Sequence, residues 1–214
     1  YHLTLLVKNE VGYHNLMRIA SEAYLKGFYY KPRIDLEYLA EHSEGLICLS
    51  GCLKSQLCQT ILHHGDDPGS ALETAATYRD IFAEGDFYIE LQYNGLDLQK
   101  RALDGLLPVA RDLGIPMVAS NDVHYLTRAH ARPHDVLLCI QTGKCVGDKS
   151  RLKFASDEFY LKTPEEMWSE WGHLPDALNN TLEVAEKCEL AIDFDDYHVP
   201  PFPTPDGSTP DKYF

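Results

Sequence analysis

Several features that would assign the chain to a common functional class are missing from its sequence. No apolar run approaches the roughly 20 residues that a membrane-spanning helix needs, and no signal peptide is visible. There is no Walker loop, no GxGxxG motif, no GxSxG elbow and no paired DxD on a strand. Neither a kinase, nor a dinucleotide enzyme, nor a polymerase palm is therefore visible in these residues.

Basic residues are also scarce. The chain has 19 Lys and Arg against 33 Asp and Glu, which gives a formal net charge of -14. A surface this negative repels nucleic acids and anionic membranes, so we expect no membrane partner and no extended nucleic-acid groove on this chain alone. Bound metal ions would reverse the sign of the field inside a pocket.

The six cysteines form no CxxC pair, and most of them lie in apolar runs such as GLICLS and VLLCIQ. This pattern predicts buried thiols in a reducing compartment rather than a disulfide scaffold. We therefore expect a cytoplasmic protein.

The two ends of the chain indicate how it is organised. The first residues, YHLTLLVKN, are already strand-like, which leads us to expect a fragment whose true N-terminus is missing. The last 17 residues, HVPPFPTPDGSTPDKYF, contain five prolines and are typical of a linker. We expect one domain over residues 1–197 and a linker over residues 198–214.

Hydrophobic periodicity predicts alternating strands and helices, which favours the α/β class with a parallel sheet and helices outside it. Strands are expected over 2–9, 46–53, 87–93 and 115–122. Helices are expected over 12–28, 34–45, 69–85, 96–114, 131–144 and 174–190, and a short extended segment followed by a helix over 151–171.

Polar residues near the strand ends are the candidates for chemistry, because sites in parallel α/β folds form at the carboxyl ends of strands. Asp122 ends the fourth predicted strand, and His124 follows two residues later, so both side chains can face one point. A carboxylate and an imidazole suit Zn²⁺, Mn²⁺ or Fe. A hydrogen-bonded Asp–His pair without metal is the alternative, in a turn where Asp122 caps the following helix or binds the backbone. Cys52 follows a glycine at a strand end, although a free cysteine is usually a small buried hydrophobe.

Other residues give weaker signals. Glu90 lies inside a strand, where a charge network is as good an explanation as catalysis. Lys31 and Arg33 form a small basic cluster that could hold a phosphate or pair with local acids. His130 and His134 are four residues apart on a predicted helix and share a face, but no HExxH motif accompanies them. His2 precedes a strand instead of following one, so it indicates little by itself.

Six segments taken together and in order resemble one known family. They are HLTLLVKNEVGYHNLMRIASEAYLKGFYYKPRID, EGLICLSGCL, PMVASNDVHYL, HDVLLCIQTGK, DEFYLKTPEEM and ALNNTLEVAEKC. The resemblance is to the N-terminal polymerase-and-histidinol-phosphatase (PHP) domain of the bacterial DNA polymerase III alpha subunit, and it covers nearly the whole chain. It implies part of a distorted (β/α)₇ TIM-like barrel, with up to three divalent metal ions (Zn, Mn or Mg) in the complete domain.

Residue by residue, the resemblance implies that His2, Cys52, Asp122 and His124 are metal ligands. The family's first HxH motif and the His and Glu ligands after it are absent, because the chain starts beyond them. The parent protein would be a DNA-directed DNA polymerase that binds DNA and other replicase subunits, including a proofreading exonuclease subunit, and the fragment alone is expected to be inactive. The metal site would serve 3′→5′ exonuclease proofreading. The alternatives are a structural scaffold that docks the proofreading subunit, and a stand-alone PHP phosphoesterase.

Overall fold

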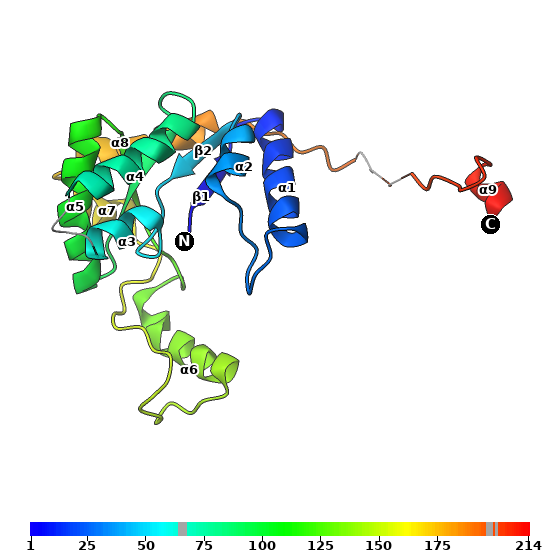
Figure 1. The fold of residues 1–214 in the computed structure, drawn as a ribbon. Helices are drawn as coiled ribbons and strands as arrows, with labels where there is room; N and C mark the ends of the chain where they lie inside the picture. The colour runs from blue at the N-terminus through cyan, green and yellow to red at the C-terminus, as the bar shows by residue number, and fades with distance from the viewer. Residues whose placement is uncertain (64–67, 196–198, 200) are drawn as a thin grey trace.

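A four-stranded sheet organises the chain, and its strand order follows the sequence (Figure 1). The computed structural model describes residues 1–63, 68–195, 199 and 201–214. The strands are β1 (Thr4–Val7), β2 (Leu46–Leu49), β3 (Phe87–Gln92) and β4 (Met117–Ser120). Each lies inside one of the four segments for which hydrophobic runs predict a strand.

The prediction of a parallel sheet is wrong for the first strand. β1 runs antiparallel to β2, with Thr4 opposite Leu49 and Val7 opposite Leu46, whereas β2, β3 and β4 are mutually parallel. Alternating hydrophobic runs report the order of elements. They do not show whether two successive strands are parallel or antiparallel. Here the connection between β1 and β2 contains two helices, α1 (Glu10–Leu25) and α2 (Leu36–Glu41). Because β1 is antiparallel, its start lies at the same edge of the sheet as the ends of the other three strands.

Both faces of the sheet are covered, as expected for short and almost continuously apolar strands. Cys48 and Ile89 belong to the main core, where they pack with side chains of α3 (Gln56–His63), α4 (Pro68–Ile81) and α5 (Asp97–Leu113). The opposite face forms a smaller cluster, in which Tyr88 packs with Val184 of α8 (Pro175–Lys187). The α/β class is therefore confirmed, and the larger barrel to which these strands would belong stays a prediction.

The ends of the helices follow local sequence signals. Asn9 caps α1 by accepting a hydrogen bond from the Gly12 N–H. Thr163 and Glu166 form a capping box at the start of α7 (Pro164–Trp171). Gly114 ends α5 in the left-handed conformation, as its position in the sequence indicates. The helices are thus bounded by short-range contacts, and these are the boundaries that sequence patterns predict best.

One part of the chain lies away from the sheet. A short 3₁₀ turn, η1 (Arg128–His130), leads into α6 (Ala131–Thr142), which Figure 1 shows set apart from the sheet and the other helices.

The last helix is α9 (Pro210–Tyr213). The predicted boundary between the domain and the linker, at residues 197 and 198, falls outside the described residues. In the described ranges no helix is both long and apolar enough to cross a membrane. All six cysteines are free thiols, and three of them are buried.

Candidate metal site at the strand ends

The antiparallel first strand brings His2 to Cys52. His2 precedes β1 and Cys52 follows β2, and their Nδ1 and Sγ atoms lie 3.8 Å apart. The His2 N–H also donates to the Lys54 carbonyl oxygen at 3.1 Å, which fastens the first residues to the turn after β2. Gly51 makes this approach possible, because it has a φ of +87° and a Cβ there would lie only 3.1 Å from the His2 oxygen.

The electrostatic surroundings favour the neutral form of the His2 imidazole. Burial, followed by the positive charge of Lys54, lowers the pKa of His2 from its ordinary value, and Lys31 acts in the same direction. Neutral imidazole is the form that binds a metal ion. The pair therefore offers a nitrogen and a sulfur donor, a combination that suits Zn²⁺.

Asp122 and His124 form the second pair, as their spacing predicts. Asp122 Oδ1 lies 3.1 Å from His124 Nε2, and both side chains are partly exposed. The backbone of the pair is held as well. Asn94 Nδ2 donates to the Asp122 carbonyl oxygen, and the His124 N–H donates to the carbonyl oxygen of Phe159. The alternative in which Asp122 caps the next helix is wrong, because the residue that precedes η1 as its N-cap is Thr127.

Aromatic rings surround the His124 imidazole. Its centroid lies 4.8 Å from that of Phe154, 5.5 Å from that of Phe159 and 5.7 Å from that of His134 on α6. Of the predicted i, i+4 histidine pair, His134 therefore approaches the site, while His130 is exposed and belongs to η1. Burial, followed by the neighbouring His124, lowers the pKa of His134. The ring contacts fix the position of α6 relative to the Asp122–His124 pair.

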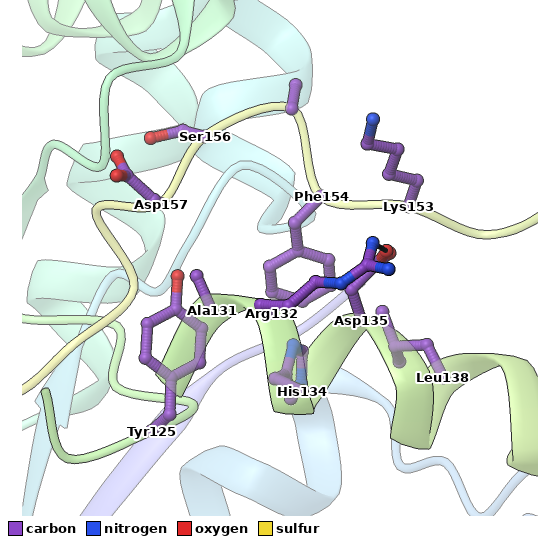
Figure 2. A pocket seen from close by; sticks show the side chains of 11 residues that line it. Tyr125, Ala131, Arg132, His134, Asp135, Leu138, Lys153, Phe154, Ser156 and Asp157 are labelled. Carbon is purple, nitrogen blue, oxygen red and sulfur yellow. Dashed lines mark ion pairs between the residues drawn. The ribbon is translucent and has the colours of Figure 1, made fainter. Parts of the chain in front are cut away.

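A cavity of about 450 Å³ opens beside these rings, between α6 and the loop over residues 153–157 (Figure 2). Tyr125, His134 and Phe154 are among its lining residues. The two walls are joined by a two-point ion pair, in which Arg151 Nη1 and Nη2 donate to the Asp135 carboxylate at 2.5 and 2.8 Å. Asp135 therefore links α6 to the loop that follows it.

A buried polar cluster lies at the same sheet edge, around Glu90. Glu90 is 6% exposed. Its Oε1 accepts hydrogen bonds from Ser120 Oγ and from Gln92 Nε2, and its N–H donates to Ser50 Oγ. Glu90 Oε2 and Gln92 Oε1 are buried without a hydrogen-bond partner among the described residues. The serines at the ends of β2 and β4, Ser50 and Ser120, are the sequence feature that indicates hydrogen-bond partners for Glu90.

The residues present fit a divalent cation in their chemistry. Nitrogen, sulfur and carboxylate donors are available, and two buried acceptor oxygens at the same edge lack a donor. A transition metal generally takes at least three protein ligands. Within the described ranges no group of three or more His, Cys, Asp or Glu side chains is close enough to hold one ion. The four predicted ligands therefore lie in two separate pairs, each with two possible donors.

Comparison with known proteins shows which proteins this chain is similar to. Residues 1–94 match the family model of the PHP domain. The chain is 46% identical to the DNA polymerase III subunit alpha of Thermus aquaticus, in an alignment covering 100% of this chain and 18% of that protein. For the same subunit of Treponema pallidum (strain Nichols) the values are 47%, 90% and 16%, and for that of Deinococcus radiodurans 42%, 97% and 16%.

These matches confirm the predicted resemblance and also delimit it. The family model covers His2 and Cys52 and ends before the Asp122–His124 pair. The alignment with the Thermus aquaticus subunit extends over both pairs. The chain spans less than a fifth of the length of these relatives.

Proposed function

We propose that this chain, whose residues 1–94 belong to the PHP domain family, is the PHP portion of a DNA polymerase III alpha subunit and supplies ligands to a divalent-metal phosphoesterase site. One observation carries the proposal. Two donor pairs that are distant in sequence, His2–Cys52 and Asp122–His124, follow or precede strands at a single edge of the sheet.

Each pair has a role that its own atoms support. His2 and Cys52 would hold a divalent ion through Nδ1 and Sγ, donors that suit Zn²⁺, and Asp122 and His124 would hold Zn²⁺ or Mn²⁺ through a carboxylate oxygen and Nε2. A bound divalent ion supplies Lewis acidity and a water of lowered pKa. Without it, the Asp122–His124 contact already orients both side chains toward one another. Hydrogen bonds from the backbone of the two pairs to Lys54, Phe159 and the Asn94 side chain hold the pairs in place.

The reaction that fits such a site is metal-dependent cleavage of a phosphodiester, and in a replicative polymerase this would be 3′→5′ exonuclease proofreading. The partners would be DNA, bound mainly through the rest of a longer polypeptide, and other replicase subunits, including a proofreading exonuclease subunit. We place the protein in the cytoplasm, in accordance with its six free thiols.

A structural scaffold is the second candidate, and one observation favours it. The described residues hold donors only in pairs, and a pair by itself binds metal weakly. In that case the pairs would stabilise the fold, and the domain would brace the polymerase and dock the proofreading subunit.

Elemental analysis of the full-length protein tests the site. We expect divalent metal in the unaltered protein, with most of it lost in Asp122→Ala/His124→Ala and in Cys52→Ala. The matched control is His63→Ala/Asp80→Ala, which removes the same residue types from exposed positions elsewhere. Absence of metal from the unaltered protein, or equal metal in all variants, would refute the proposed site.

Two further readouts separate the candidates. The reading frame that encodes the chain should continue into a polymerase, and a frame limited to a PHP domain would point to a stand-alone phosphoesterase. Digestion of a 3′-labelled single strand should require both the metal and the Asp122–His124 pair. Metal loss that lowers thermal stability, in a protein that never digests the strand, would favour the scaffold.

A further inference from the structure

The connection between α1 and α2 differs in charge from the rest of the chain. The connection over residues 26–35, KGFYYKPRID, contains three basic residues and one acidic residue, Asp35, in a chain with 33 acidic residues. Lys26 is paired with Glu22 on α1, while Arg33 stacks on an aromatic ring. A local positive patch therefore interrupts a surface that otherwise repels polyanions.

Three consecutive aromatic rings are exposed in this connection. Phe28 is 55% exposed, Tyr29 62% and Tyr30 84%. The rings of Tyr29 and Tyr30 meet edge to face with centroids 4.6 Å apart, and the Arg33 guanidinium lies 4.8 Å from the Tyr29 centroid. Because aromatic side chains are usually buried, three adjacent exposed rings indicate a surface that contacts something else.

The backbone holds these rings in place. Tyr30 has a φ of +61°, and it is the only non-glycine residue with a positive φ in the described part of the chain. This conformation is unfavourable for a bulky side chain. The Tyr29 N–H donates to the Lys31 carbonyl oxygen at 3.1 Å across the turn. A glycine at position 30 would relieve the strain and remove the ring, so the structure retains an exposed aromatic ring at an energetic cost.

The connection also lies close to the first donor pair. Figure 1 shows it descending at the same end of the molecule as the N-terminus. Lys54, whose carbonyl oxygen accepts from the His2 N–H at 3.1 Å, adds a cation beside the first donor pair.

We propose that Phe28, Tyr29 and Tyr30, together with Lys31 and Arg33, form a stacking platform for single-stranded nucleic acid. Exposed rings beside cations are what single strands require, because every base has a face that stacks and every nucleotide carries a phosphate. The platform is independent of the metal site. That it delivers a strand to the His2–Cys52 pair rests on the proposed function.

Photo-crosslinking tests the platform in the full-length protein. A single-stranded oligonucleotide substituted with 5-iododeoxyuridine is irradiated with the protein in excess EDTA, and the crosslinked peptides are identified by mass spectrometry. We expect a crosslink within residues 27–33, reduced about tenfold in Tyr29→Ala and in Tyr30→Gly. The second variant keeps the left-handed turn without strain, so its loss of crosslinking would not result from unfolding. Lys31→Glu should lower the yield while retaining all three rings.

The matched control is Phe194→Ala. Phe194 is 83% exposed, but it is flanked by Asp193 and Asp195, so its ring should contribute nothing to the crosslinks. The absence of a crosslink in residues 27–33, or equal yields in all variants, would overturn the proposal. So would protection of the three rings from hydroxyl radicals before nucleic acid is added, because another part of the polypeptide would then cover them. If elemental analysis finds no metal but the crosslinks in residues 27–33 still form in EDTA, the proposed metal site is refuted and the stacking platform is supported.

Discussion

The substitution Gly51→Ala tests whether the turn after β2 builds the first donor pair. Gly51 has a φ of +87°, where an alanine costs about 1–2 kcal/mol. The added Cβ would also lie 3.1 Å from the His2 oxygen and 3.3 Å from the Ser55 Cβ. Both distances are shorter than ordinary van der Waals contacts, so the backbone at His2 must move by a few tenths of an ångström. The movement would separate His2 Nδ1 from Cys52 Sγ.

Gly114→Ala is the matched control. Gly114 has a φ of +64°, but no atom lies within 4 Å of a Cβ built on it, and it ends α5 away from the donor pairs. Both variants should therefore lose a similar 1–2 kcal/mol from the backbone conformation alone. In a domain of this size that corresponds to a fall in Tm of about 2–4 °C for each kcal/mol.

Metal binding separates the two variants. Titration with Co²⁺ gives a charge-transfer band when a thiolate binds the ion, so the band reports on Cys52. We expect the affinity to fall about 10–100-fold in Gly51→Ala, the range typical when a ligand loses its orienting contacts, and to stay unchanged in Gly114→Ala. Equal affinities in the two variants would refute the argument that Gly51 positions His2. Cys52→Ser should abolish the band in either background.

Three other predictions concern stability and reactivity. Arg151 lowers the pKa of Asp135, so the ion pair stabilises the fold above the ordinary Asp pKa of 3.8, and that contribution is lost as the pH falls through the lowered value. The protection factors of the α6 amides, which correct for the slower intrinsic exchange at acid pH, should therefore fall as the pH is lowered, and Asp135→Asn should show the lower protection already at neutral pH. In a timed iodoacetamide reaction read by mass spectrometry, the exposed Cys145 should react first, and Cys48, whose pKa burial raises, should react last. Thr163→Ala removes one half of a capping box and should cost about 1 kcal/mol in urea unfolding, whereas a change below 0.3 kcal/mol would show that the cap contributes little.

Sequence patterns predict best what depends on neighbouring residues. The Asp122–His124 contact follows from a spacing of two in an extended segment, and it forms as expected. The helix caps at Thr163 and Gly114 are equally local. Sequence patterns predict contacts between residues far apart in the chain less well. The position of His2 before a strand indicates little by itself, and only the family resemblance implies that it is a ligand.

The missing information was the direction of one strand. Because β1 is antiparallel, His2 lies at the edge where β2 ends, although 50 residues separate it from Cys52. The approach of α6 to the site is hidden for a similar reason. Its periodicity predicts the helix, but the contact between His134 and His124 depends on rings from the later loop, Phe154 and Phe159.

Glu90 is hydrogen-bonded to the chain segments that carry both donor pairs, which gives this buried carboxylate of the third strand a structural role. Ser50, two residues before Cys52, accepts the Glu90 N–H, and Ser120, two residues before Asp122, donates to Glu90 Oε1. The chain segments that carry the two donor pairs are therefore hydrogen-bonded to the same residue of β3. A shift of either segment would break a bond to Glu90, and since the site is buried, the freed group would find no water to replace it. The partner-free Oε2 of Glu90 makes this support sensitive to charge, because a nearby cation would satisfy an oxygen that no described donor reaches. Binding of metal at the strand ends and the stability of the sheet edge are thus expected to be coupled through one side chain.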